Sequence, residues 1–203
     1  MKKTLTMLLC ASLIFSALAV TAFAEGLTHT VIRGDSMWKI AVKYQVGLSE
    51  LKAANPRIKN PDLIYPGDVI LIPGKDAQTA AYESEVIKLV NEHRRKNGLG
   101  ELKEDWQLSR VARYKSQDMR DKKYFSHTSP TYGSPFQMMK SFGISYKTAG
   151  ENIAKGYKTP KAVVDGWMNS SGHRANILNS SFTHIGVGYV ADGNYWTQMF
   201  ISK

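Results

Sequence analysis

The sequence predicts an α+β fold in two modules, and three observations support this prediction. A segment at 28–73 places two helical patterns between two short apolar strands. A run of small and polar residues, GKDAQTA at 74–80, follows and is typical of a linker. In the remaining segment, 81–203, helical patterns come first and an alternating apolar and polar hairpin comes last. This order favours helices packed over an antiparallel sheet.

The first 24 residues, 1–24, have the pattern of a secretory signal peptide. Two lysines precede an apolar stretch at 5–20, and the sequence AFA, which suits cleavage, ends at Ala24. The apolar stretch is short for a membrane span, which needs roughly 20 residues. We therefore expect a secreted chain that begins at Glu25 and is not an integral membrane protein after cleavage. The single cysteine, Cys10, lies in this segment, so the secreted chain would have no disulfide.

The chain is basic, with 27 lysines and arginines against 17 acidic residues and a formal net charge of +10. A basic exported protein is attracted to anionic surfaces such as teichoic acid, peptidoglycan carboxylates or lipid headgroups. Nucleic acid is not expected as a partner, because export removes the chain from most of it. The basic residues also form no long tract.

Local signals predict the order strand, helix, helix, strand in the small module. The run HTVI at 29–32 predicts a strand, and GDS at 34–36 supplies a turn and a helix cap before MWKIAVKY. Ser49 can cap a second helix that ends at Asn55, before a proline. The sequence YPGDVILIP at 65–73 predicts a turn followed by an apolar strand.

The motifs GDSMWKIAVKY, LKAANP and IYPGDVILIP, in this order and spacing, resemble the LysM domain, a carbohydrate-binding module of cell-wall proteins. The resemblance covers essentially all of 28–73. It implies binding of glycans that contain N-acetylglucosamine, such as peptidoglycan or chitin, in a groove between two loops, 34–37 and 60–66. The candidate glycan-binding residues in these loops are Gly34, Asp35, Ser36, Met37, Ile64 and Tyr65.

Core packing is the alternative role for several apolar residues of this module. Trp38, Ile40, Ala41 and Tyr44 recur at helical spacing and are interpreted as core side chains. In the second loop, the neighbouring isoleucine and tyrosine can also cap the core instead of covering a sugar face.

Two helices are predicted at the start of the larger module. Apolar residues recur at helical spacing from 81 to 97, where a glycine ends the pattern. A second helix is expected from Trp106 to about Asp121, with Arg110, Arg113 and Lys115 at solvated positions.

Turn and cap residues define the rest of this module. Pro135 can open a helix through Phe142, and Thr159 with Pro160 can cap and open another. The sequence GENIA at 150–154 is a possible strand. The segments IGVGYV and YWTQMFIS alternate in polarity and are separated by ADGN, which predicts a β-hairpin.

Two histidines of the larger module fit structural roles. His93 lies on the apolar stripe of the first helix, as a packed or capping side chain would. His184 directly precedes the strand IGVGY, which is typical of a residue at a strand edge.

The ordered motifs FSH, AGENIA, WMNSSGHRANIL, HIGVGY and YWTQMF resemble the CAP superfamily of cysteine-rich secretory, antigen 5 and pathogenesis-related proteins. More narrowly, they resemble the bacterial SCP-like branch found on secreted proteins of spore-forming bacteria. This resemblance implies an α-β-α sandwich and a cleft with two histidines and two glutamates that can hold a divalent metal. Matched by motif, these are His127, Glu151 and His173, while Ser170 takes the place of the second glutamate.

The missing carboxylate changes the expected chemistry of the cleft. Two neutral imidazoles and one carboxylate are enough protein ligands for an open zinc site, so His127, Glu151 and His173 are candidate metal ligands. Once Glu151 binds a metal, no residue of this set remains to act as a general base, which argues against an enzyme. Alternatively, Glu151 holds a loop and His173 caps a short helix. Residues expected to line or support the cleft are Tyr124, Ser126, Asn152, Asn176 and Gln198.

These inferences predict a secreted protein of the cell wall or extracellular space whose LysM module binds peptidoglycan or a related N-acetylglucosamine polymer. Its CAP cleft would take a ligand, a wall protein or a lipid. Two alternatives stay open. One is a metal-dependent hydrolase that acts on the cell wall. The other is a structural protein of the spore envelope or coat, because LysM modules with SCP-like partners resemble proteins of sporulating cells.

Overall fold

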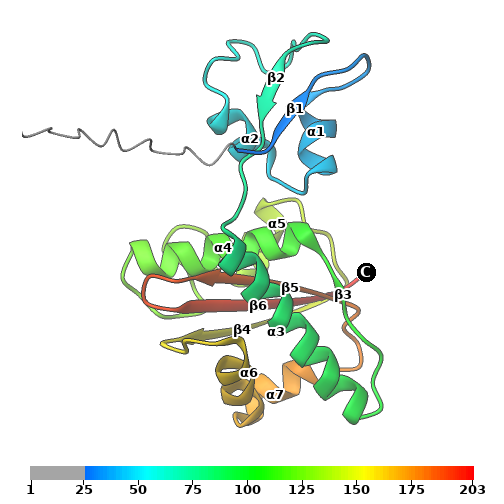
Figure 1. Cartoon of the computed structure of the whole chain (residues 1–203). Coiled ribbons are helices and arrows are strands. Elements are labelled where there is room, and N and C mark those ends of the chain that lie inside the picture. Colours follow the sequence, from blue (N-terminus) through cyan, green and yellow to red (C-terminus); the bar gives the residue numbers. More distant parts are fainter. Residues whose placement is uncertain (1–25) are drawn as a thin grey trace, which may run out of the picture.

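The computed structural model describes residues 26–203, so the predicted signal peptide and its cleavage site lie outside the described residues. Two modules are joined by a short extended segment (Figure 1). Within the described range, no helix is both long and apolar enough to cross a membrane.

The small module has the predicted order of strand, helix, helix and strand. Its strands pair antiparallel, with His29 opposite Ile70. Its elements are β1 (Thr28–Thr30), α1 (Met37–Lys43), α2 (Leu48–Ala54) and β2 (Val69–Leu71). Its core contains Val31, Met37, Ile40, Ala41, Leu51, Ile70 and Ile72. Four short elements therefore enclose one apolar core.

The outer side of α1 differs from the expectation. Ile40 and Ala41 are buried as predicted, and Tyr44 is partly buried against the core. Trp38, however, is 55 % exposed, so its assignment to the core is wrong. Helical periodicity places Trp38 on the apolar side of α1. The two short strands, however, are too small to cover the whole of that side.

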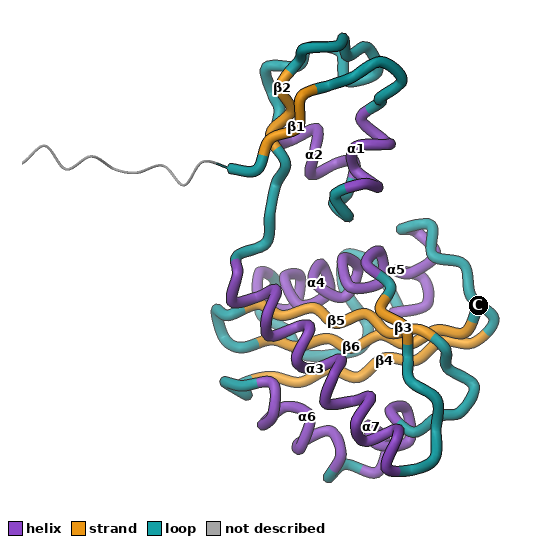
Figure 2. Tube along the Cα trace, turned by 45° about the vertical axis from the view of Figure 1, so that its right-hand side comes forward, coloured by secondary structure: helices purple, strands orange, loops and turns teal. Residues whose placement is uncertain are grey.

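The larger module is an α-β-α sandwich. It contains α3 (Ala77–Lys96), β3 (Lys103–Glu104), α4 (Trp106–Asp121), α5 (Pro135–Ser141), β4 (Thr148–Lys155), α6 (Pro160–Met168), α7 (Ser171–Ile177), β5 (His184–Val190) and β6 (Tyr195–Ser202). The strand order is β3-β5-β6-β4, parallel between β3 and β5 and antiparallel elsewhere, which leaves β4 at an edge. Helices α4 and α5 cover one face, and α3, α6 and α7 cover the other (Figure 2).

Two helices begin at residues other than those expected. Helix α3 starts inside the predicted linker, because the Asp76 side chain accepts a hydrogen bond from the Thr79 nitrogen and caps the helix. Helix α2 starts after Gly47, so Ser49 lies within its first turn instead of capping it. The Ser49 hydroxyl donates to Glu50.

Two glycines of β5 allow α4 to lie directly on the sheet. A Cβ added to Gly186 or Gly188 would lie under 3.0 Å from the backbone of α4, a separation that real Cβ atoms essentially never show. The Ser116 hydroxyl joins the same contact, at 3.0 Å from the Gly188 oxygen and 2.9 Å from the Thr197 hydroxyl. The position of α4 is therefore tightly constrained.

An arginine of α4 connects the two modules. Arg110 donates from Nε to Glu50 Oε1 at 2.5 Å and from Nη2 to Glu50 Oε2 at 2.8 Å. Its guanidinium also lies over the rings of Tyr114 and Phe142, at 5.3 and 5.4 Å from their centres. Burial raises the pKa of Glu50, but the hydrogen bonds from Arg110 and Ser49 outweigh it and lower this pKa to about 2.

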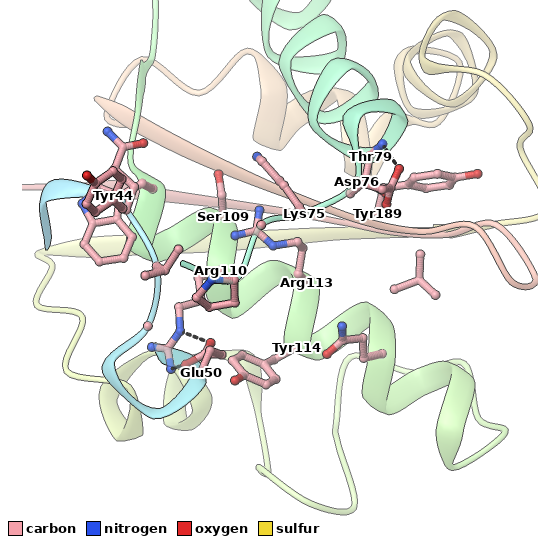
Figure 3. Close-up of a pocket in the computed structure, with 18 of the residues that line it drawn as sticks. Tyr44, Glu50, Lys75, Asp76, Thr79, Ser109, Arg110, Arg113, Tyr114 and Tyr189 are labelled. Carbon is pink, nitrogen blue, oxygen red and sulfur yellow. Dashed lines mark hydrogen bonds and ion pairs between the residues drawn. The ribbon is translucent and has the colours of Figure 1, made fainter. Parts of the chain in front are cut away.

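A second set of ion pairs holds the linker. Glu83 of α3 is buried and accepts from Lys75 of the linker and from Arg113 of α4, each at 2.8 Å. Lys75, Arg113 and the Arg110–Glu50 pair line a cleft of about 870 Å³ between the modules (Figure 3). The expected solvated positions of Arg110 and Arg113 are thus wrong, because both bind carboxylates.

Replacing Gly188 with alanine should destabilise the larger module by about 1–3 kcal/mol, because the new methyl group would overlap the α4 backbone. Denaturant unfolding followed by tryptophan fluorescence would measure this. Gly172→Ala is the matched control, since nothing lies within 4 Å of its added Cβ. Equal stability of the two variants would contradict the close packing of α4 on β5.

Replacing Arg110 with alanine should release the small module. The bidentate pair with Glu50 is lost, and hydrogen bonds between charged groups are each worth about 1.5–3 kcal/mol. Small-angle X-ray scattering should then show a wider distribution of distances than in the wild type. Arg95→Ala removes an exposed pair with Glu101 within the larger module and should leave the profile unchanged. An unchanged Arg110→Ala profile would refute the connection.

Candidate functional site

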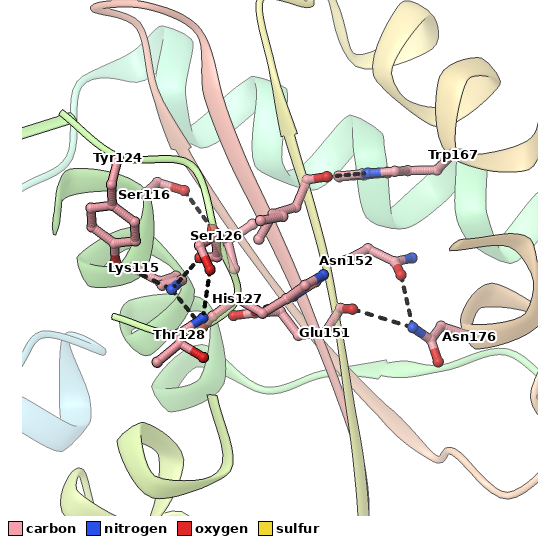
Figure 4. Close-up of polar contacts among 12 residues, drawn as sticks. Lys115, Ser116, Tyr124, Ser126, His127, Thr128, Glu151, Asn152, Trp167 and Asn176 are labelled. Atoms are coloured by element: carbon pink, nitrogen blue, oxygen red, sulfur yellow. Dashed lines mark hydrogen bonds and ion pairs between the residues drawn. The ribbon is translucent and has the colours of Figure 1, made fainter. Parts of the chain in front are cut away.

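The three predicted cleft residues come from three separate elements that meet at β4, the edge strand of the sheet. His127 lies in the loop after α4, Glu151 on β4, and His173 in α7. Figure 4 shows the His127 loop and Glu151 on the α4 side, with Asn176 approaching β4 from the side of α7. The site therefore combines groups from both helical layers of the sandwich.

His127 and Glu151 are in direct contact. His127 Nδ1 lies 2.7 Å from Glu151 Oε1, and the imidazole is 53 % exposed whereas the carboxylate is 1 % exposed. Burial raises the pKa of Glu151, and the hydrogen bond with His127 and the charge of Lys115 oppose this rise. When Glu151 is ionised, this short contact needs a hydrogen on His127 Nδ1, which then donates to the carboxylate.

The second carboxylate oxygen has different surroundings from the first. Glu151 Oε2 is buried without a hydrogen-bond partner among the described residues. A buried carboxylate oxygen in this state costs free energy, in keeping with the raised pKa of Glu151.

His173 feels the charge of His127, although no hydrogen bond joins the two imidazoles among the described residues. Burial lowers the pKa of His173, and the charge of His127 lowers it further. Nevertheless, no group of three His, Cys, Asp or Glu residues in 26–203 is arranged to hold a metal ion. The arrangement thus joins two of the three candidate ligands and leaves the third nearby, and metal binding stays a prediction.

An amide network fixes α7 against β4. Asn152 donates to the His173 carbonyl oxygen at 3.1 Å and to Gln198 Oε1 at 3.0 Å. Asn176 donates to Asn152 Oδ1 at 2.8 Å and to the Glu151 carbonyl oxygen at 3.2 Å. These predicted supporting residues therefore hold the two backbones that carry His173 and Glu151.

Lys115 is the residue of this site that sequence reasoning missed. It was expected to be solvated, yet its side chain is fully buried beneath the His127 loop. Its ammonium donates to the Ser126 and His127 carbonyl oxygens at 2.8 and 2.7 Å, and to the Tyr124 hydroxyl at 3.2 Å. Burial lowers the pKa of Lys115 below its ordinary value, and the charges of Glu151 and Asp118 offset only part of this decrease. All three hydrogen bonds of the ammonium therefore go to atoms of this loop.

Asp118, one turn further along α4, holds the other end of this loop. It accepts from the Tyr124 hydroxyl and the Ser129 hydroxyl at 2.6 Å each, and from the Thr131 hydroxyl at 2.5 Å. Burial raises the pKa of Asp118, but these three hydrogen bonds outweigh burial and bring the pKa below its ordinary value. The spacing of Lys115 and Asp118, three residues apart on one helix, is the only sequence signal that could have indicated this pair.

Ser170, His184 and His93 take no part in the hydrogen bonds around His127 and Glu151 described above. Ser170, at the position of the missing glutamate, is the N-cap residue of α7 and makes no side-chain cap bond. His184 opens β5 and contacts the Thr183 hydroxyl at 2.8 Å, in keeping with a strand-edge role. His93 is partly buried on α3, where its carbonyl oxygen accepts from Asn97.

The predicted glycan loops lie at the end of the small module that is remote from the larger one (Figure 1). Gly34 has a φ of 95°, a left-handed conformation that favours glycine. Tyr65 is 58 % exposed, and Ile64 is partly buried against the core. Met37 is 2 % exposed, so its side chain belongs to the core and cannot cover a sugar face. Leu63 of the second loop was not predicted, but at 53 % exposure it is a better candidate than Met37 for an apolar contact with a sugar.

Comparison with known proteins identifies both modules. Residues 87–201 match the cysteine-rich secretory protein family (CAP), and residues 29–73 match the LysM domain. The chain is 67 % identical over 127 residues to the protein YkwD of Bacillus subtilis, covering 63 % of this chain and 49 % of YkwD. The crystal structure of an extracellular protein containing an SCP domain from Bacillus anthracis matches with 34 % identity and a TM-score of 0.60. That match covers 68 % of this chain and 47 % of the other.

Shorter matches come from proteins with other printed functions. SpoIVD-associated factor A of Bacillus subtilis is 51 % identical over 47 residues, 23 % of this chain and 12 % of that protein. The N-acetylmuramoyl-L-alanine amidase sle1 of Staphylococcus epidermidis is 35 % identical over 75 residues, 37 % of this chain and 22 % of the amidase. The chain thus spans about half or less of the length of these relatives.

Replacing Lys115 with methionine should loosen the His127 loop. The apolar side chain fills similar space but leaves two carbonyl oxygens and a hydroxyl without their donor, at a cost of about 3 kcal/mol. Hydrogen-deuterium exchange in residues 124–132 should rise. Lys122→Met removes the same charge from an exposed position at the end of α4 and serves as the control. Equal exchange in both variants would show that the ammonium does not hold the loop.

Proposed function

The chain belongs to the cysteine-rich secretory protein (CAP) family and carries a LysM domain before its CAP domain. From this premise we propose that the protein is anchored to peptidoglycan. In this proposal the LysM loops bind N-acetylglucosamine-containing glycan. The CAP cleft at His127, Glu151 and His173 then binds a second component of the wall. The protein acts outside the cytoplasm, in the cell wall or the extracellular space.

The observation that carries the glycan assignment is the accessibility of the LysM loops. Both loops lie at the end of the module away from the CAP domain, so a long glycan can approach them without meeting the larger module. Exposed Tyr65 and Leu63 offer apolar faces, and the neighbouring loop offers main-chain groups to pair with acetamido groups. The Arg110 and Glu50 pair keeps the CAP domain on the opposite side.

The CAP cleft is better suited to binding than to hydrolysis. Its buried carboxylate is committed to His127, and Lys115 is committed to backbone oxygens. Ser170 supplies no second acid or base. The exposed imidazole of His127 is the polar group that a hydroxyl, amide or ammonium group of a ligand can reach. Such donors are abundant on wall peptides and amino sugars.

A second candidate function is a structural role in the spore envelope or coat. The similarity over 47 residues to the spore coat assembly protein ExsA of Bacillus cereus, 51 % identical, favours it. A fluorescent fusion followed through sporulation separates the two functions. Signal on the developing spore alone supports the coat role, and signal on the vegetative wall supports the proposal above.

The Tyr65→Ala variant should bind purified peptidoglycan about tenfold more weakly than the wild type, since loss of one aromatic contact costs about 1.4 kcal/mol. Co-sedimentation at several peptidoglycan concentrations measures this. Tyr157→Ala removes a tyrosine of the CAP domain that is 38 % exposed, against 58 % for Tyr65, and should bind like the wild type. Equal weakening in both variants would contradict glycan binding by the LysM loops. Release of muropeptides by the wild type but not by His127→Ala would establish a hydrolase instead.

A further inference from the structure

The cleft of about 870 Å³ between the modules, hereafter the inter-module cleft, belongs to neither of the sites proposed above (Figure 3). Its volume lies within the range of roughly 300–1,000 Å³ that ligand sites occupy. The small module lines it with residues between Tyr44 and Glu50, and the larger module lines it with α4 and the turn after β5. A ligand in this cleft would therefore contact both modules.

The charges that line the inter-module cleft balance, although the whole chain carries a net charge of +10. Its four cationic residues are Lys75, Arg110, Arg113 and Arg120. Its four acidic residues are Glu50, Asp76, Glu104 and Asp192. The three arginines also pair with the carboxylates of Glu50, Glu83 and Asp121. Because the lining has no net charge and its arginines are already paired, the cleft favours an uncharged ligand over an anionic polymer.

Aromatic residues from both modules line the inter-module cleft. Tyr44 comes from the small module, and Trp106 and Tyr114 come from α4. All three are partly exposed. Trp167 and Trp196 donate from their indole nitrogens to backbone oxygens, whereas Trp106 Nε1 has no hydrogen-bond partner among residues 26–203. An aromatic ring with an apolar face and a polar edge suits the mixed apolar and hydroxyl surface of a sugar ring.

Two glutamines, one from each module, add hydrogen-bonding groups to the inter-module cleft. Gln45 directly follows the C-cap residue of α1, and Gln117 lies on α4. Both are exposed, and neither side-chain amide is hydrogen-bonded to another of the described residues. An amide offers both donors and an acceptor. It can therefore pair with the hydroxyl and acetamido groups of a saccharide from either side of the cleft.

We propose that the inter-module cleft is a second carbohydrate site, which binds an uncharged saccharide with hydroxyl and acetamido groups between the two modules. The Arg110–Glu50 pair holds the two walls of this site together. Gly47 makes room for that pair, because a Cβ added there would overlap the guanidinium of Arg110. The site is separate from the LysM loops and from the CAP cleft, so it goes beyond the proposed function.

An NMR titration of the full secreted chain with a soluble N-acetylglucosamine trimer tests this inference. The trimer carries no charge and presents both hydroxyl and acetamido groups. The indole N–H signal of Trp106, identified by its loss in Trp106→Phe, should shift and saturate. A galacturonic acid trimer has the same length but carries carboxylates, and it should leave this signal unchanged at the same concentrations.

The two glutamines provide variants in both walls of the site. Gln45→Gly removes one amide without straining the backbone, because Gln45 has a φ of 54°, which glycine adopts readily. Gln117→Ala removes the other amide from α4. Each variant should bind the trimer about fivefold more weakly, as followed at Trp106, since one hydrogen bond is worth about 1 kcal/mol. Gln107→Ala, on the same helix but outside the lining of the cleft, is the matched control and should bind like the wild type.

The signals of the two carbohydrate sites separate the inference from the proposed function. A trimer that shifts the amide signals of 60–66 but not the Trp106 indole would overturn the inference and leave the proposed function intact. A shift at Trp106 without one at 60–66 would support the inference and contradict glycan binding by the LysM loops. Wild-type affinity in both glutamine variants, equal binding of the two trimers, or no shift at either site would also overturn the inference.

Discussion

The close packing of α4 on β5 is the constraint on which the cleft and the arrangement of the modules depend. Gly186 and Gly188 remove the side chains that would separate the helix from the sheet. With the helix at this depth, residues on its different sides reach different targets. Lys115 and Asp118 hold the His127 loop, whereas Arg110 reaches the LysM domain. One helix position therefore determines where the His127 loop and the small module lie.

Buried charge is the second organising feature of the CAP domain. The ammonium of Lys115, the carboxylate of Asp118 and the carboxylate of Glu151 influence one another beneath a single loop. Burying one charge alone is very costly, but hydrogen bonds and opposite charges offset most of that cost here. All three donors of Lys115 serve the loop, so the buried second oxygen of Glu151 receives none of them. The loop is thus held by one buried ammonium and one buried carboxylate of α4.

Local signals predicted most elements, because caps and turns act over a few residues. Ser134 and Thr159 cap α5 and α6, next to the prolines that were expected to open these helices. The two-residue strand β3 has no period to detect, and it exists because Lys103 and Glu104 pair with β5. The burial of Lys115 was also beyond local reasoning, since its partners lie in a loop whose path depends on the whole fold. Motif resemblance named the cleft residues, but only tertiary structure shows that His127 and Glu151 touch.

The absence of a second carboxylate at Ser170 has a consequence for the kind of ligand the cleft can accept. An acid at that position could take a proton from a ligand or water, whereas a serine hydroxyl donates weakly and accepts. The remaining groups are an acceptor oxygen on Glu151 and two imidazoles, of which His127 is largely exposed. Burial raises the pKa of Glu151, against the hydrogen bond with His127 and the charge of Lys115. The exposed His127 imidazole, held by a buried carboxylate, is therefore the group of this set that solvent reaches, and Ser170 brings no acid or base beside it.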